Sequence, residues 1–342
     1  MKKATAANRS RARRSSIRKR KGGAITDALQ IRNVLIPIDF SESSLHAIEC
    51  ALPLIKRLGA DLHLVHVFAP DYPLVSMTTI PLIVPELEIG SRLRRQLKDV
   101  AGKYSIEFRR ENIHALKGRP FEEICRLARD RGIDLIVTST RGNTGLKHLV
   151  LGSTAERIVR YSPCPVLIIR PFDRKKKAGR NARRELNFGK ILVPIDFSEC
   201  SIKGLAYAKA LAKQFRSKLV LLHSVALQYY IAADEYARYD FPLVIKQVEK
   251  RSRDQMRNLI EKTDWDGIEV ESSLQIGHAG EQICARAIDH GADVIVTSTH
   301  GRTGFKHVLL GSTAEYVVRH ASCPVLVVPS HERPALASGK DS

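Results

Sequence analysis

Signatures of membrane-spanning and secreted proteins are missing from this sequence of 342 residues. No apolar run approaches the roughly 18 residues that a transmembrane helix needs, and the first residues lack the apolar core of a secretory signal. None of the six cysteines forms a CxxC pair, so zinc-binding and redox motifs are not indicated. We therefore expect a cytoplasmic protein with no transmembrane segment and with free thiols.

Catalytic signatures are missing as well. The sequence contains no Ser-His-Asp order, no cluster of metal-binding residue types and no residue that is marked as a general base. These absences favour a binding protein over an enzyme.

Acidic and aromatic residues are missing from positions 1–22, which carry ten Lys and Arg. A second basic segment, 174–190, has eight Lys and Arg and one Glu, and the two segments together hold 17 of the 20 net positive charges. We expect a basic disordered tail at 1–30, a basic linker at 173–188 and a loose tail at 331–342. The first tail suits contact with nucleic acid or another polyanion, and it equally suits a solvated extension. Without aromatic residues it is not suited to base stacking.

What the sequence does contain is a long internal repeat. TSTRGNTGLKHLVLGSTAE at 138–156 returns as TSTHGRTGFKHVLLGSTAE at 297–315. A repeat of this kind indicates two similar units, and a chain of this length exceeds most single cores. We expect one domain over 31–172 and a second over 189–330.

Each unit alternates short apolar segments with helical patterns. In the first unit we expect strands at Asn33–Ile38, at Leu62–Phe68, within Ile106–Leu116, at Asp134–Thr138 and at Val166–Ile169. In the second we expect them at Ile191–Asp196, Lys218–Val225, Ile268–Ile276, Asp293–Thr297 and Val325–Val328. Nearly continuous apolar strands that alternate with helices predict an α/β fold, a parallel sheet with helices on both faces.

The repeat also gives each unit the parts of a phosphate-binding site. Ligands of open α/β sheets bind beyond the carboxyl ends of the strands. There the sequence places Asp39 after the first strand, a glycine loop after the fourth, and Gly152-Ser153 at the start of the last helix. Backbone N–H groups at a helix start favour phosphate oxygens, and glycine lets the backbone approach closely. The equivalent residues of the second unit are Asp196, Gly301, Gly311 and Ser312.

The same residues also suit a purely structural role. Ser153 and Glu156 have the spacing of a capping box, in which Ser caps the helix and Glu bonds back. Gly142 could be a turn glycine. Asp39 could cap the helix after the first strand or bond to the loop after the fourth. His66, near the end of the second strand, fits packing or hydrogen bonding better than ligand binding. The counterparts in the second unit are Ser312, Glu315, Gly301, Asp196 and His223.

The segments Pro37-Ile38-Asp39-Phe40-Ser41 and Pro194-Ile195-Asp196-Phe197-Ser198, with the glycine loops and the CPV segments before the last strands, resemble the universal stress protein family. The resemblance covers the chain except the two tails and the linker. It implies two tandem Rossmann-like domains of strand order 3-2-1-4-5, packed as a pseudo-dimer, because many members pair through their fifth strands. It also implies a stress-response regulator or sensor that binds adenine nucleotide, with at most slow ATP hydrolysis.

One position departs from the pattern that ATP-binding members of the family show, G-x2-G-x9-G-S/T. In the first unit Gly142, Gly152 and Ser153 fill the last three places, but Ser139 replaces the first glycine. The serine would cost about 1 kcal/mol if its φ angle is positive, or its hydroxyl could donate to a phosphate. The second unit has Gly301, Gly311, Ser312 and Ser298 in these places.

The resemblance implies ATP as the ligand of one or both domains, with Mg²⁺ as an option. On the adenine side it points to Asp39 and Val67, and to Asp196 and Ser224 in the second unit, where a polar residue replaces the usual apolar contact. The residues assigned to the nucleotide are Pro37, Ile38, Asp39, Val67, Thr138, Ser139, Arg141, Gly142, Gly152, Ser153, Thr154, Pro194, Ile195, Asp196, Ser224, Thr297, Ser298, His300, Gly301, Gly311, Ser312 and Thr313. The alternative is an interaction module that binds no nucleotide and whose basic tail contacts nucleic acid or another polyanion. A homodimer is a further expected assembly.

Overall fold

The computed structural model describes residues 30–68, 86–104, 109–140, 151–170, 186–225, 241–301 and 310–329. The predictions for the basic tail, for most of the linker and for the C-terminal tail lie outside these residues. So do Arg141 and Gly142 of the first glycine loop. Among the described residues, no helix is both long and apolar enough to span a membrane.

The first half alternates strands and helices as predicted. Its elements are β1 (Asn33–Pro37), α1 (Glu42–Leu58), β2 (Asp61–Phe68), α2 (Glu86–Lys103), the 3₁₀ turn η1 (Arg110–Asn112), β3 (Ile113–Lys117), α3 (Pro120–Asp130), β4 (Leu135–Ser139), α4 (Ser153–Tyr161) and β5 (Val166–Ile169).

The second half repeats this order. Its elements are β6 (Lys190–Pro194), α5 (Glu199–Phe215), β7 (Lys218–Val225), α7 (Phe241–Lys262), β8 (Val270–Ile276), α8 (Ala279–Asp289), β9 (Val294–Ser298), α9 (Ser312–His320) and β10 (Val325–Val328).

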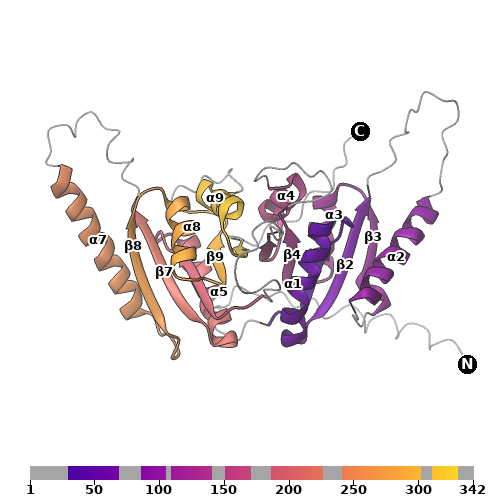
Figure 1. Ribbon diagram of the computed structural model, residues 1–342, viewed down its shortest axis with the longest axis horizontal. Coiled ribbons are helices and arrows are strands. Elements are labelled where there is room, and N and C mark those ends of the chain that lie inside the picture. Colours follow the sequence, from indigo (N-terminus) through magenta and orange to yellow (C-terminus); the bar gives the residue numbers. More distant parts are fainter. Residues whose placement is uncertain are drawn as a thin grey trace, which may run out of the picture.

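The two halves form one sheet of ten strands in the order β3-β2-β1-β4-β5-β10-β9-β6-β7-β8. Within each half the neighbouring strands are parallel, and each half has the order 3-2-1-4-5. The halves meet where β5 pairs antiparallel with β10, with Leu167 opposite Leu326. The α/β fold class and the pairing of the halves through their fifth strands are therefore confirmed (Figure 1).

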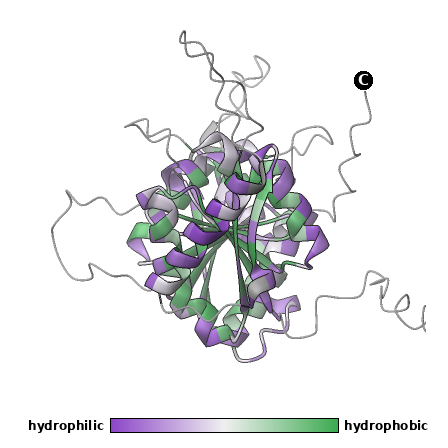
Figure 2. Ribbon diagram, turned by 90° about the vertical axis from the view of Figure 1, so that its right-hand side faces the viewer, coloured by the Kyte–Doolittle hydropathy of each residue, from purple (hydrophilic) through white to green (hydrophobic). Residues whose placement is uncertain are grey.

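Helices cover both faces of this sheet, so the apolar side chains form two layers. Successive residues of β1 alternate between them, because Val34 and Ile36 lie in one buried cluster and Leu35 in the other. The first cluster includes residues of α1, α2, α5 and α7, and the second includes residues of α3, α4, α8 and α9. Figure 2 shows the result, with mostly hydrophobic strands inside and helices outside that carry both hydrophilic and hydrophobic residues.

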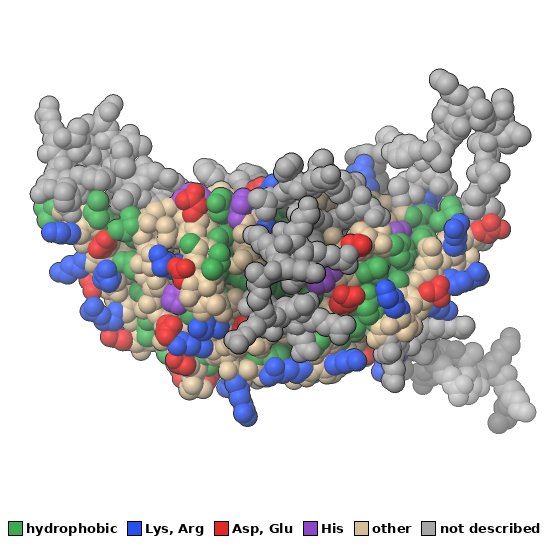
Figure 3. Space-filling view, viewed as in Figure 1, with side chains coloured by type: hydrophobic (Ala, Val, Ile, Leu, Met, Phe, Trp, Pro, Cys, Tyr) green, Lys and Arg blue, Asp and Glu red, His purple; other side chains and the backbone are tan. Residues whose placement is uncertain are grey.

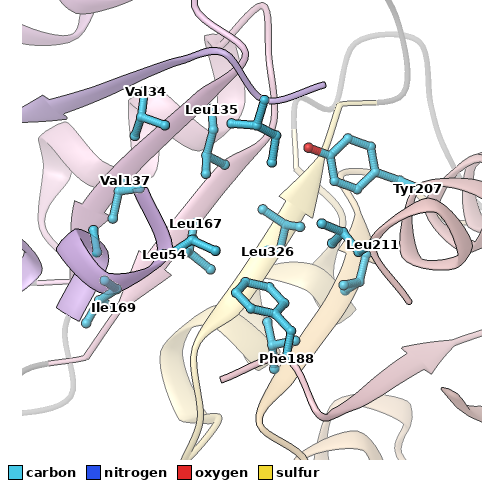
Figure 4. Close-up of a cluster of buried hydrophobic side chains, with 14 of the residues drawn as sticks. Val34, Leu54, Leu135, Val137, Leu167, Ile169, Phe188, Tyr207, Leu211 and Leu326 are labelled. Carbon is cyan, nitrogen blue, oxygen red and sulfur yellow. The ribbon is translucent and has the colours of Figure 1, made fainter. Parts of the chain in front are cut away.

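The core continues across the junction of the two halves. Leu54 and Leu167 of the first half and Leu211 and Leu326 of the second belong to the same buried cluster. In Figure 4 these side chains converge from both sides of the junction. On the face seen in Figure 3, acidic and basic side chains are interspersed, as expected if most of the net positive charge lies in the tail and linker.

Several predicted strands begin later in the structure, including β8, expected from Ile268 and found from Val270, and β9, expected from Asp293 and found from Val294. The strand expected within Ile106–Leu116 is β3, Ile113–Lys117, and it follows the 3₁₀ turn η1. The strand expected from Asp134 begins at Leu135, because the Asp134 carboxylate accepts hydrogen bonds from the backbone N–H groups of Arg32 and Asn33, at 2.9 and 3.0 Å. This side chain ties the start of β1 to β4 instead of extending the strand.

Candidate functional site

The turn after β1 is built around Asp39. Its Oδ1 accepts hydrogen bonds from the backbone N–H and the hydroxyl of Ser41, at 3.0 and 2.5 Å. Ser41 in turn caps α1 by accepting from the N–H of Ser44 at 3.2 Å. Asp39 therefore does not cap the helix itself; it orients the residue that does. The same contacts join Asp196, Ser198 and Ser201 in the second half.

Between the aspartate and the cap lies a phenylalanine with an unusual backbone. Phe40 has φ = 62°, in the left-handed region that side-chain-bearing residues rarely adopt. The His66 ring packs against it with centroids 4.8 Å apart, and its Nδ1 donates to the Ile38 carbonyl at 2.7 Å. The prediction that His66 packs and hydrogen bonds is confirmed. The second-half counterparts are Phe197 (φ = 63°), His223 and Ile195.

The serines that replace the first loop glycine lie at the ends of strands. Ser139 ends β4 and pairs with Ile169, and Ser298 ends β9 and pairs with Val328. Neither has a positive φ angle, so the strain considered for these substitutions does not arise. The Ser298 hydroxyl donates to the carbonyl of His300 at 2.7 Å, which fixes the start of its loop.

The start of α4 corrects the capping-box interpretation. Gly152 is the N-cap and Ser153 the first helical residue, and no side chain caps this helix. The N–H of Gly152 donates to the carbonyl of Thr140 at 2.8 Å, so the two ends of the glycine loop are held together. The α9 start has the same form, with Gly311 bonded to Thr299 at 2.7 Å. The first N–H groups of each helix therefore point beyond its end without a side-chain cap.

In the second half the structure brings three predicted residues together. A Cβ atom at Gly301 would lie 2.6 Å from Oδ2 of Asp196, far inside contact distance. A Cβ atom at Gly311 would lie 3.4 Å from the Thr299 carbonyl and 3.8 Å from the backbone N of Gly301. Carboxylate, loop glycine and helix start therefore meet at the carboxyl edge of the sheet.

The strand-end residues at the adenine side differ between the halves. Val67 is half-buried near the end of β2. Its counterpart Ser224 donates from its hydroxyl to the carbonyl of Gly277 at 3.0 Å, so a backbone partner satisfies this polar side chain. Thr138 and Thr297 are buried within their strands, while Thr154 and Thr313 are half-buried in the first turns of α4 and α9.

Sequence reasoning missed two kinds of residue here. Thr140 and Thr299 accept the bonds that close the loops, and Phe40 and Phe197 supply the left-handed turns. The recurrence of TST in both units could have indicated the threonines. Nothing in the sequence indicates that a phenylalanine adopts a positive φ angle. Within the described part of the chain, no group of three or more His, Cys, Asp or Glu is arranged to hold a metal ion.

Comparisons with known proteins bear on the family and the fold of the chain. The model of the universal stress protein family matches residues 30–170 and 187–329. Universal stress protein YxiE of Bacillus subtilis is 33% identical over 147 residues, which are 40% of this chain and 97% of the relative. A universal stress protein of Methanocaldococcus jannaschii is 32% identical over 142 residues, 41% of this chain and 82% of the relative.

A solved structure shares the tandem arrangement. The universal stress protein from Archaeoglobus fulgidus superimposes with a TM-score of 0.59 at 23% identity, over 88% of this chain and 100% of that one. At this identity the likeness concerns the fold alone.

Proposed function

This chain belongs to the universal stress protein family, and from that premise we propose that it binds adenine nucleotide, ATP in the first instance, at the carboxyl edge of the sheet in one or both halves. The observation that carries the proposal is the meeting of Asp196, Gly301 and the uncapped start of α9 at Gly311. The first half offers the same parts in Asp39 and the uncapped start of α4 at Gly152.

The helix starts supply the phosphate contacts. The N–H groups of the first turn lack partners within the helix, and the helix dipole favours negative charge at this end. The helices α1 and α5, which also begin at the carboxyl edge, have their starts closed by Ser41 and Ser198. The starts of α4 and α9 are followed by exposed Ser153 and Ser312, whose hydroxyls can add to the backbone donors.

The glycines keep this space open. A Cβ atom at Gly301 would force the loop or the Asp196 carboxylate to move. A carboxylate in this position can accept a hydrogen bond from a ribose hydroxyl or an adenine amino group. If Mg²⁺ accompanies the nucleotide, the phosphate oxygens are its natural ligands, as is usual for a metal that keeps several waters.

The proposal is tested by ligand release and titration. The purified full chain is denatured in acid and the supernatant is analysed for nucleotide, and ligand-free chain is titrated with ATP in a calorimeter. We expect released adenine nucleotide or measurable heat, and up to two ATP per chain. No released nucleotide together with no heat on adding ATP would refute the proposal.

The alternative interaction-module function predicts a different result for one variant. In Gly152→Val the branched side chain crowds the start of α4. If the site binds nucleotide, ATP affinity of the first half falls. If the loop only holds the fold, thermal stability or assembly changes and ATP titration does not.

A further inference from the structure

The helices that begin at the two candidate sites also approach each other where the halves meet. In Figure 1, α4 and α9 lie on either side of the centre of the molecule. Arg319, in the last turn of α9, places its Nη2 3.5 Å from Oε2 of Glu156 in the first turn of α4. The same Nη2 lies 2.8 Å from Oε1 of Glu315, one turn earlier on its own helix. One guanidinium is therefore shared by carboxylates of both halves.

Glu156 poses an electrostatic problem for an anion site. A carboxylate in the first turn stabilises its own helix by interacting with the positive end of the dipole. It also lies only about 6 Å along the axis from Gly152, given a rise of about 1.5 Å per residue, and so repels an anion bound there. Glu315 stands in the same relation to Gly311.

The arginines offset this repulsion unequally. Arg160 approaches Glu156 within its own helix, with Nη2 2.5 Å from Oε1. Glu156 thus has one arginine from each half, while Arg319 serves both Glu156 and Glu315.

The burial of these groups strengthens their interactions. The four side chains are between 22% and 34% exposed, so they are less screened than surface pairs. The Nε atoms of Arg160 and Arg319 are buried, with no hydrogen-bond partner among the described residues. Packing holds both stems, and their terminal nitrogens face the carboxylates.

We propose that Arg319 is a positioning residue that acts across the junction: by offsetting the charge of Glu156, it raises the affinity of the first half for the phosphates of its ligand. The inference rests on the proposed nucleotide function and adds that the second half tunes the first. Because Arg319 also offsets Glu315, its loss weakens both sites, whereas loss of Arg160 weakens the first alone.

The test measures ATP affinity of the full chain by calorimetry, in a Gly301→Ala background whose weakened second site lets binding to the first site be followed separately. In this background we expect Arg319→Gln to weaken ATP binding about two- to fivefold, the range for charges near a helix start. Arg319→Lys keeps the charge and should retain most of the affinity. The difference in ATP affinity between chains with and without Arg319→Gln should shrink as the salt concentration rises.

Glu156→Gln is the matched control, since it removes the repulsion that Arg319 offsets. It should raise ATP affinity, and adding Arg319→Gln to it should then change the affinity of the first site little. A purely structural role for Arg319 would give the same loss with or without Glu156, and that result would overturn the inference. The inference would also be overturned if chains with and without Arg319→Gln bound ATP equally well. That result would leave the proposed function intact. No ATP binding by the unmodified chain would overturn both.

Discussion

Oδ2 of Asp196 lies so close to Gly301 that a Cβ atom there would be only 2.6 Å from it. Asp196 follows the first strand of the second half and Gly301 follows the fourth, so this contact crosses the point where the strand order reverses. Ligands of open α/β sheets bind at such reversal points. The glycine is therefore required here by a specific neighbour, since its φ angle does not lie in the left-handed region.

Gly301→Ala should test that contact directly. The added methyl group must displace either the loop or the carboxylate, so we expect ATP affinity of the second half to fall at least about tenfold, or 1.4 kcal/mol. Overpacking should also cost about 1–3 kcal/mol in the free energy of unfolding. Calorimetry with ATP and urea denaturation measure the two effects.

Gly90→Ala is the control, because nothing lies within 4 Å of a Cβ atom there and the residue is inside α2. It should stabilise the protein by about 0.5–1 kcal/mol through helix propensity. Unchanged ATP binding and stability in Gly301→Ala would contradict the close contact with Asp196.

Replacing the serines at two helix starts with alanine should change the free energy of unfolding by different amounts. Ser198 caps α5 and accepts from the N–H of Ser201 at 3.2 Å, so Ser198→Ala should cost about 0.5–2 kcal/mol of unfolding free energy. Ser312 is not the cap of α9, so Ser312→Ala should change stability by less than about 0.5 kcal/mol. Urea denaturation of both variants distinguishes the cap from the capping-box interpretation, which predicts a similar loss in each.

Acid should destabilise the first half through a buried histidine pair. Nδ1 of His63 lies 3.2 Å from Nε2 of His114, and both side chains are buried. Burial lowers the pKa of both, and with the neighbouring His63 and Arg131 it brings the pKa of His114 to about 4. The unfolded chain takes up protons near the ordinary histidine pKa of about 6.5, while the folded chain does not.

Above about pH 6.5 both histidines are neutral in the folded and the unfolded chain, so the pair does not lower the free energy of unfolding. That free energy should fall as the pH drops from about 6.5 towards 4. His114 alone should account for about 2–3 kcal/mol by pH 4.5, at roughly 1.4 kcal/mol per pKa unit. The second half has Val220 and Ser273 at the matching register positions. The double variant His63→Val, His114→Ser should flatten the pH dependence of the unfolding free energy, and an unchanged slope between pH 6.5 and 4.5 would rule out this pair as its source.

The contact between the last two helices differs between the halves in which helix supplies the aromatic side chain. In the first half the Arg157 guanidinium lies over the Phe121 ring, 5.1 Å from its centroid. In the second half the matching residues are Tyr316 and Gly280, and a Cβ atom at Gly280 would lie 2.5 Å from Cδ1 of Tyr316. The larger aromatic group comes from α3 in one half and from α9 in the other.

Gly280→Phe should therefore destabilise the second half by about 1–3 kcal/mol, because the Tyr316 ring already fills the space. Adding Tyr316→Arg recreates the pair of the first half and should recover most of that loss, a coupling that a double-mutant cycle of urea denaturation measures. If the two changes simply add, the packing in the two halves is not interchangeable in this way.

Much of the fold followed from local pattern. The strands Lys218–Val225, Val166–Ile169 and Val325–Val328 were predicted with the bounds that the structure shows, since each is a short apolar run ended by turn residues. The start of β4 was misplaced because Asp134 lies next to an apolar run, but its carboxylate is used by backbone N–H groups of Arg32 and Asn33. That contact joins segments that are distant in the sequence, so no local sequence pattern indicates it.

The candidate site also has parts that the sequence predicts and parts that only the structure shows. The sequence by itself determined that an aspartate, a glycine loop and a helix start recur in both halves, because these depend on residue type and spacing. Only the tertiary structure decided what each does. Gly152 and not Ser153 is the N-cap, Asp39 orients the cap serine, and Arg319 reaches the first turn of a helix in the other half. Each of these is set by the pairing of strands and halves, which brings together groups that are far apart along the chain.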